Sequence, residues 1–311
     1  MAPIILHHYP LSPFAEKVRL ILGYKQLSWQ SVHIPMYMPK PDVIALTGGH
    51  RRTPFMQIGA DIYCDSNLIA DVLEQIKPTP TLYPEAVKGA ARIVAQWADT
   101  LVFPVAMAYN FQPAGAAYVL AKWSPEDVKV FVQDRATMRG GAPRMPPADA
   151  IGMYKSYLRR LSHMLEQHPF LMGDVPSIAD FSAYHPTWYT LRQVPLLADI
   201  FKATPNVRDW LERMEKLGHG THTDLSATQA LQIAHDSQPA DVSQEPFIDH
   251  HGIPLGSQVV ITAESFGLEP TAGELVAATR TRYTVRRTDD RAGTVHVHFP
   301  RNGFILKKVK S

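Results

Sequence analysis

The N-terminal segment changes its hydrophobic period abruptly, and this change constrains the fold more than any other feature of the chain. Residues 4–8 (IILHH) form a short apolar run that is typical of a buried strand. Directly afterwards, apolar residues recur at helical spacing over residues 13–24, beginning with Phe14. Ser12 and Pro13 stand at the joint, where serine is a favoured N-cap and proline a favoured first helical residue. A strand that leads directly into a capped helix predicts an α/β unit.

The remainder of the first 80 residues continues this alternation of strand and helix signals. The expected elements are a strand over 27–34, a helical turn around 42–46, a hairpin formed by 54–58 and 61–64, and a helix over 66–76. This order predicts that residues 1–80 form a small α/β domain.

Composition and pattern divide the rest of the chain into two parts. After a Pro-rich linker at 77–86, apolar residues at helical spacing predict an all-helical domain over 84–224. A polar, turn-rich linker at 235–246 then precedes short β-like runs, which predict a small antiparallel β domain over 245–311. The expected fold class is therefore α/β plus all-α, with a small antiparallel β extension whose role the sequence does not indicate.

The bulk composition is that of an ordinary globular protein with a sizeable core. The chain has 311 residues, 45% hydrophobic and 19% charged, and its formal net charge of +2 selects no class of partner. Its one cysteine, Cys64, cannot form an intramolecular disulfide. The sequence shows neither a signal-peptide pattern nor an apolar run near the ~20 residues of a membrane span. We therefore expect a cytoplasmic protein with no membrane partner, and no His, Cys or Asp spacing suggests a metal site.

Three polar motifs are candidates for ligand binding: Ser12 at a helix start, Arg-Thr-Pro at 52–54 before a strand, and Asp65-Ser66 between a strand and a helix. A helix N-terminus presents unpaired N–H groups and a partial positive charge, which can hold an anion. If that anion is a thiolate, the same field lowers the pKa of the thiol. On local grounds alone, ordinary helix capping explains Ser12 and Asp65-Ser66 equally well.

In this order and spacing the motifs resemble a known family. S-P-F-x-x-K-V-R from Ser12, R-x-P from Arg52 and D-S-N-x-I from Asp65 resemble the thioredoxin-like domain of the serine-type cytosolic glutathione S-transferases. GDVPSIADFSAYHPTW at 173–188 resembles the family's G-x-x-[ST]-x-A-D segment, in which Ser177 and Asp180 would form a capping box. The resemblance covers roughly residues 3–222, and it implies a thioredoxin-like domain followed by a helical bundle.

The resemblance also implies roles for individual residues. Ser12 matches the serine that stabilises the glutathione thiolate, and Tyr9 remains open as the alternative contact to the sulfur. Pro54 matches a cis-proline, although the sequence does not show whether it is cis, and the backbone of Thr53 would pair with the cysteinyl part of glutathione. Asp65 and its successor match the pair that binds the γ-glutamyl end. The expected glutathione-binding residues, with Arg52 and secondarily Lys40 for the glycine carboxylate, are Lys40, Arg52, Thr53, Pro54, Asp65 and Ser66.

The second substrate is expected between the α/β domain and the long helices. The apolar candidates for this electrophile pocket are Phe14, Phe103, Met107, Tyr109 and Phe111, with Tyr118, His185 and Trp188 as further candidates. The implied activity is conjugation of glutathione, a co-substrate, to a small apolar electrophile, without a metal and in a homodimer.

Two alternatives stay open. The protein could be a non-catalytic glutathione-binding scaffold whose basic C-terminal β domain, with nine Lys and Arg over 280–311, binds a partner. It could also use the same thiolate for isomerisation, dehalogenation or peroxide reduction. Few aromatic residues interleave with the basic run, so nucleic acid is not the expected partner.

Overall fold

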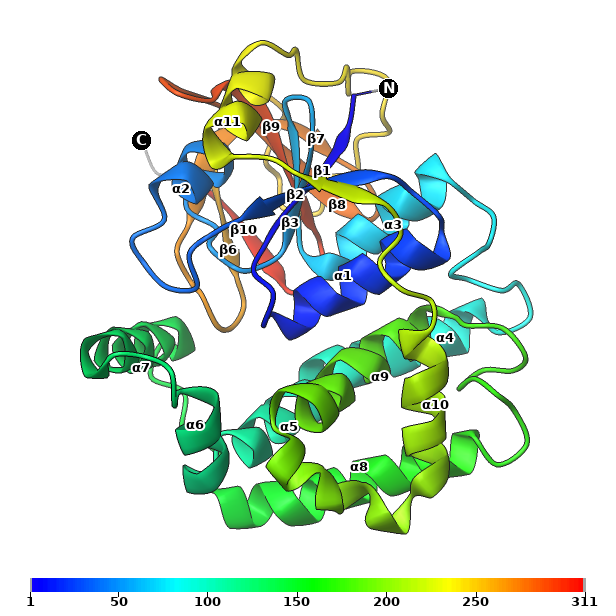
Figure 1. Ribbon diagram of the computed structural model, residues 1–311. Coiled ribbons are helices and arrows are strands. Elements are labelled where there is room, and N and C mark those ends of the chain that lie inside the picture. The colour runs from blue at the N-terminus through cyan, green and yellow to red at the C-terminus, as the bar shows by residue number, and fades with distance from the viewer. Residues whose placement is uncertain (1, 310–311) are drawn as a thin grey trace.

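In the computed structural model, which describes residues 2–309, the predicted α/β unit lies above a layer of helices (Figure 1). The N-terminal unit comprises β1 (Ile4–His8), α1 (Pro13–Tyr24), β2 (Trp29–His33), α2 (Pro41–Thr47), β3 (Phe55–Ile58), β4 (Asp61–Cys64) and α3 (Ser66–Ile76). Each element predicted over residues 1–80 is present, and the Thr53–Pro54 peptide bond is cis.

The helical part follows, and a single π-helical turn joins its first two α-helices. It comprises α4 (Lys88–Trp97), η1 (Ala98–Val102), α5 (Phe103–Asn110), α6 (Pro113–Val119), α7 (Pro125–Arg139), α8 (Pro147–Met164), α9 (Ile178–Trp188), η2 (Tyr189–Gln193), η3 (Pro195–Ala203) and α10 (Pro205–Glu215). The predicted capping box opens α9, because the Asp180 carboxylate accepts hydrogen bonds from the N–H (2.9 Å) and the hydroxyl (3.1 Å) of Ser177.

The C-terminal part comprises β5 (His222–Asp224), α11 (Ala227–His235), β6 (Gln258–Ala263), β7 (Thr271–Ala278), β8 (Arg282–Asp289), β9 (Gly293–Pro300) and β10 (Phe304–Lys308). The antiparallel pairing of β6 to β10 confirms the predicted antiparallel β region. Residues 274–287, which read as one β-like run in the sequence, contain a turn that separates β7 from β8, and the two strands pair with each other. The sequence pattern also missed β5 and α11.

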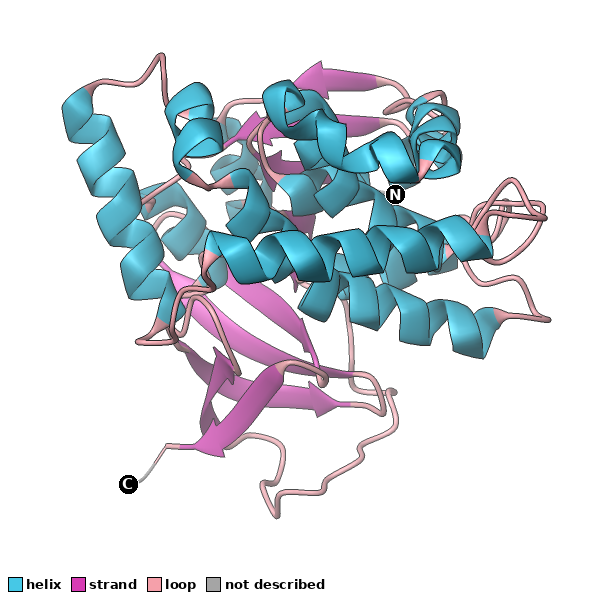
Figure 2. Ribbon diagram, turned by 90° about the horizontal axis from the view of Figure 1, so that it is seen from below, coloured by secondary structure: helices cyan, strands magenta, loops and turns pink. Residues whose placement is uncertain are grey.

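All strands belong to one sheet, in the order β10-β6-β7-β8-β9-β4-β3-β1-β2-β5. The C-terminal strands join the N-terminal ones through a parallel pairing of β9 with β4, in which Val297 lies opposite Ile62. Buried hydrogen bonds reinforce this joint, because His298 Nε2 lies 2.9 Å from an Asp61 carboxylate oxygen and His298 Nδ1 lies 2.9 Å from the Thr284 hydroxyl. Figure 2 shows the strands extending away from the helical layer toward the C-terminus.

The N-terminal strands are buried on both faces because they alternate apolar side chains between two cores, whereas β6 to β10 contribute to only one of these cores. Leu6 of β1 belongs to the core that the sheet shares with α1, α3 and the helical layer. Its neighbour Ile5 belongs to the core on the opposite face, together with Phe55, Val297 and Phe299. The N-terminal and C-terminal strands therefore share one hydrophobic core as well as one sheet.

Candidate functional site

The register of the sheet brings the three predicted motifs to one end of the N-terminal strands. Phe55, the first residue of β3, lies opposite His7 of β1 and opposite Cys64 of β4. β1 and β4 therefore end where β3 begins. The start of α1 after β1, the cis-proline before β3 and the start of α3 after β4 all leave the sheet at this end.

Ser12 is the N-cap of α1, and Pro13 is its first helical residue. The Ser12 hydroxyl oxygen accepts a hydrogen bond from the Ala15 N–H at 3.2 Å, and the residue is only 2% exposed. A hydroxyl has one hydrogen to donate and two lone pairs. Capping therefore uses a lone pair and leaves the hydrogen of Ser12 free to bond an anion at the N-terminus of α1.

The start of α3 differs in one detail from the expected capping by Ser66. Asp65, with a positive φ of 80°, is the N-cap, and its carboxylate accepts from the Asn67 N–H at 2.9 Å. Burial raises the pKa of the Asp65 carboxyl. The Ser66 hydroxyl instead accepts a hydrogen bond from Lys17 Nζ at 3.2 Å. Asp65 precedes the first helical residue, so its carboxylate can reach the N–H two residues on, whereas Ser66 already lies within the first turn.

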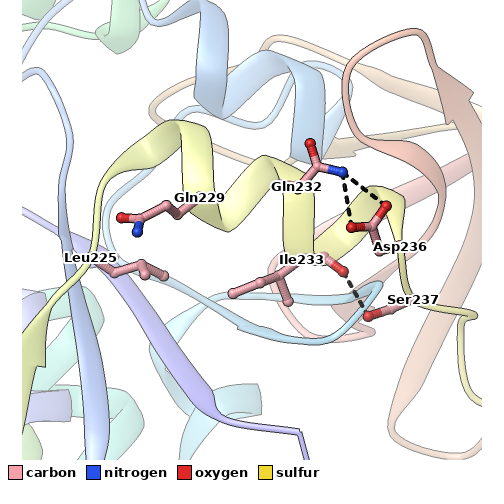
Figure 3. A pocket seen from close by; sticks show the side chains of 6 residues that line it. All are labelled: Leu225, Gln229, Gln232, Ile233, Asp236 and Ser237. Atoms are coloured by element: carbon pink, nitrogen blue, oxygen red, sulfur yellow. Dashed lines mark hydrogen bonds between the residues drawn. The ribbon is translucent and has the colours of Figure 1, made fainter.

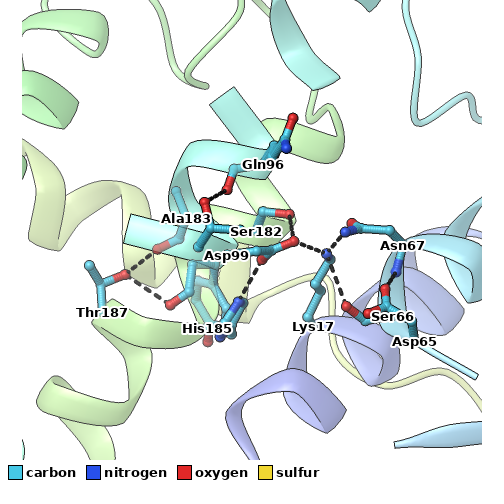
Figure 4. A network of polar contacts seen from close by, with 12 residues as sticks. Lys17, Asp65, Ser66, Asn67, Gln96, Asp99, Ser182, Ala183, His185 and Thr187 are labelled. Atoms are coloured by element: carbon cyan, nitrogen blue, oxygen red, sulfur yellow. Dashed lines mark hydrogen bonds and ion pairs between the residues drawn. The ribbon is translucent and has the colours of Figure 1, made fainter. Parts of the chain in front are cut away.

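Lys17 lies at the centre of a buried polar network (Figure 4). No functional role for Lys17 was expected from the sequence. Its ammonium group lies 2.8 Å from the carboxylate of Asp99 on η1 and donates to Asn67 Oδ1 at the same distance. Asp99 also accepts from His185 Nε2 at 2.9 Å. Burial acts to raise the pKa of Asp99, but the Lys17 charge and the His185 hydrogen bond hold it down at about 2. The network connects the start of α3 to the helical domain. Lys17 stands in the quoted S-P-F-x-x-K-V-R motif, so its position in the sequence was the available signal.

The two cations expected at the glycine end of glutathione lie in different surroundings. Arg52 is half-buried, and its guanidinium donates to the backbone carbonyls of Phe266 (2.6 Å for Nε) and Ser265 in the loop between β6 and β7. Lys40 is 4% exposed, and its ammonium makes one long hydrogen bond, 3.4 Å, to the Arg51 carbonyl. Burial, together with the nearby arginines, lowers the pKa of Lys40 to about 8. The C-terminal part of the chain therefore reaches the site that the N-terminal motifs define.

The predicted apolar residues separate into two groups. The Phe14 ring packs against Phe103 (centroids 4.6 Å apart) and against His185 (4.4 Å), directly beside the α1 N-terminus. The Nδ1 atom of His185 is buried, and no group in the described part of the chain forms a hydrogen bond with it. Tyr109, in contrast, packs on Tyr154 with centroids 5.5 Å apart, and its hydroxyl donates to the Leu197 carbonyl.

Phe111, Met107 and Tyr9 have other surroundings. Phe111 is half-buried, with its ring 6.1 Å from Tyr189, and Met107 is half-buried against the helical core. Tyr9, the alternative contact to the sulfur, has its hydroxyl 3.4 Å from Arg135 Nη2 of α7.

Four arginines of the C-terminal sheet pair with carboxylates of the same chain. Arg282, Arg286 and Arg291 pair with Glu245, Glu274 and Asp42, and Arg287 lies 3.5 Å from an Asp289 carboxylate oxygen. The guanidinium of Arg301 donates to the carbonyls of Thr279 and Ile248. These arginines therefore stabilise the fold of the extension more than they offer free positive charge.

A surface hollow lies on α11, away from the N-termini of α1 and α3 (Figure 3). Leu225, Ile233 and the polar side chains of Gln229, Gln232 and Asp236 line it, and Gln232 already donates to Asp236.

Across residues 2–309, no helix is both long enough and apolar enough to cross a bilayer. Nor do three or more His, Cys, Asp or Glu side chains gather as metal ligands anywhere in that range.

A thioredoxin-like domain whose helix starts face an all-helical domain defines the class of glutathione transferase-like proteins. Family models support this assignment: the glutathione S-transferase N-terminal domain matches residues 6–81, and the C-terminal domain matches residues 139–213. The chain is similar to a GST-like protein from Pseudomonas syringae, with 43% identity over 99% of this chain and 100% of that one, and a TM-score of 0.78. The chain therefore belongs to the glutathione S-transferase family.

Two more distant relatives match only part of this chain. Glutathione transferase F2 from Populus trichocarpa is 18% identical over 68% of this chain and 93% of that one, with a TM-score of 0.52. FtsZ-localized protein A from Caulobacter vibrioides is 24% identical over 184 residues, which are 57% of this chain and 73% of that protein.

Proposed function

We propose that this protein binds glutathione and conjugates its thiolate to a small apolar electrophile. The observation that carries the proposal is the convergence of Ser12, cis-Pro54 and Asp65 at one end of the sheet, beside the N-termini of α1 and α3. Two helix N-termini in one place favour a ligand with negatively charged groups. A γ-glutamyl peptide thiol has a carboxylate for the start of α3 and a sulfur for the start of α1.

In this proposal the chain's own groups activate and position the nucleophile. The free hydrogen of the Ser12 hydroxyl and the partial positive charge of α1 stabilise the thiolate over the thiol, which lowers the pKa of the bound sulfur. The thiolate then attacks the electrophilic carbon, a C–S bond forms, and the leaving group departs with the bonding electron pair. Phe14 and Phe103 would supply the apolar surface that holds the electrophile near the sulfur.

A second candidate is a glutathione-binding interaction protein without turnover. Two observations favour it: the groups of Arg52 and Ser66 are already bonded within the chain, and one relative is named for its localisation with FtsZ. Isomerisation, dehalogenation or peroxide reduction would use the same thiolate and belong to the first candidate as reaction subtypes.

Retention on immobilised glutathione, followed by an assay with an aryl halide, tests the proposal. Retention with elution by free glutathione, together with thioether formation, supports conjugation. Retention without turnover of aryl halide, epoxide or peroxide favours the interaction protein. Failure to bind glutathione rejects both candidates.

The remaining expectations are part of the same proposal. We propose a cytoplasmic homodimer with a division into residues 1–80, 84–224 and 245–311. The outward face of α4 and η1 supports an interface between copies, because Ile93 is 71% and Leu101 52% exposed there. Light scattering on the purified chain measures the oligomeric state directly.

A further inference from the structure

The loop between β6 and β7, residues 264–270 and here named the strap, connects all three parts of the molecule. In Figure 1 this orange loop descends from the sheet toward α7. The Gly267 N–H donates to the Met138 carbonyl of α7 at 2.7 Å, which links the extension to the helical domain. A Cβ at position 267 would lie 3.1 Å from the Met138 side chain, so the strap lies close against this helix.

A second contact holds the strap in place: an ion pair between Arg51 and Glu269. Arg51, which is 3% exposed, pairs with Glu269 of the strap at 2.6 Å and also with Asp134 of α7. Among the described residues, 2–309, the Arg51 Nε and the Glu269 Oε2 atoms find no hydrogen-bond partner. The Glu269 side chain is 37% exposed, so this anchor is weaker than a fully buried pair.

The strap also binds Arg52, the residue that the family resemblance assigns to the glycine carboxylate of glutathione. Arg52 donates through Nε to the Phe266 carbonyl at 2.6 Å and through Nη2 to the Ser265 carbonyl. Both acceptors are neutral. A guanidinium and a carboxylate can form two parallel N–H···O bonds between opposite full charges, an attraction that two neutral carbonyl acceptors do not supply.

We propose that the strap and the C-terminal carboxylate of the thiol ligand compete for Arg52, so that a ligand with a free carboxylate displaces the strap. This inference rests on the proposed function, because it takes a γ-glutamyl peptide thiol as the ligand. Arg52 exchanges two carbonyl acceptors for one carboxylate. The strap, left with its Glu269 and Gly267 anchors, then exchanges more readily with solvent. Arg52 and the strap thereby set the substrate class as thiols with an anionic third residue.

Hydrogen–deuterium exchange on the full chain tests the competition with two probes, glutathione and its glycine ethyl ester, each at saturation. Glutathione should increase deuterium uptake in a peptide that spans residues 264–270, and the ester, whose carboxylate is masked, should not. If both probes bind and uptake is unchanged or falls with both, the strap proposal is overturned while glutathione binding stands. If neither probe binds, the proposed function fails and the strap proposal fails with it.

Calorimetry on a matched pair of variants gives an independent measurement. Glu269→Gln removes the ion pair with Arg51 and should tighten glutathione binding about two- to fivefold, as expected for a partly exposed pair, with no change for the ester. Glu274→Gln is the control, because its pair with Arg286 is similarly exposed (31% for the Glu274 side chain) and lies outside the strap. Equal effects of the two substitutions, or an equal effect on both probes, would contradict the competition.

Discussion

Among single residues, Ser12 is the most important for the proposed function, because its hydroxyl oxygen and its hydroxyl hydrogen can have different partners. The Ser12 oxygen caps α1 by accepting from Ala15, and its hydrogen is left for a ligand. Capping and sulfur binding are therefore compatible, and a substitution at this position affects both.

Ser12→Ala should abolish most turnover while glutathione affinity stays nearly normal, because the γ-glutamyl contacts at the start of α3 remain. The variant should also lose about 1 kcal/mol of stability through the lost cap. Steady-state kinetics with an aryl halide and urea unfolding measure the two effects separately. Ser226→Ala is the control, since Ser226 caps α11 by accepting from Gln229 N–H at 3.2 Å. Comparable turnover in the two variants would reject Ser12 as the activating group.

We expect the buried Lys17–Asp99 pair to contribute strongly to the stability of the fold. Asp99→Asn removes one charge from a pair whose side chains are 0% and 7% exposed, and it leaves an unpaired buried ammonium group. The expected loss is about 3–5 kcal/mol in the free energy of unfolding. Asp199→Asn is the matched control, because its pair with Lys202 is 79% and 75% exposed and should contribute less than about 1 kcal/mol. Equal unfolding free energies in urea for the two variants would show that the network does not stabilise the fold.

At the scale of elements, the sequence predicts what is local. Period-3.6 and period-2 patterns, together with Ser12, predict the N-terminal elements and the hairpin, and Ser177 with Asp180 predicts the start of α9. The structure confirms these predictions. The parallel pairing of β9 with β4 and the contact of the strap with Arg52 were not predictable. They join residues more than 200 positions apart, and no local propensity specifies such a pairing.

Truncation of the chain after residue 235 should therefore destabilise the N-terminal domain as well. It would expose the edge of β4 and remove Val297 and Phe299 from the core that also holds Ile5 and Phe55. We expect a large fall in the urea midpoint or loss of soluble protein. An unchanged midpoint and unchanged solubility would show that the extension folds independently of the sheet.

At the scale of the whole molecule, buried histidines give the fold a pH dependence. Burial lowers the pKa of His7 to about 4 and of His8 and His50 to about 3, and it also lowers the pKa of His185, His296 and His298. Their folded-state pKa values lie below the ordinary value of about 6.5, so the unfolded chain binds more protons at acid pH. Burial raises the pKa of Asp65 and Asp180, which opposes the trend, but only two carboxyls act against six histidines.

The stability that the buried histidines contribute should be fully present above about pH 6.5 and should be lost as the pH falls from about 6.5 toward 4. Each proton of difference between the two states contributes about 1.4 kcal/mol per pH unit. Urea unfolding at half-unit steps of pH measures this slope. If the free energy of unfolding stayed constant or increased as the pH fell, the histidines would not be buried as neutral side chains.

The stabilised thiolate is the central claim, and the absorbance of the thiolate near 240 nm tests it most directly. With glutathione saturating the protein, a pH titration should give a thiol pKa below about 7.5, against about 8.5 for a free thiol, and Ser12→Ala should return it toward the free value. A bound thiol that titrates near 8.5 in the unmodified protein would contradict the account.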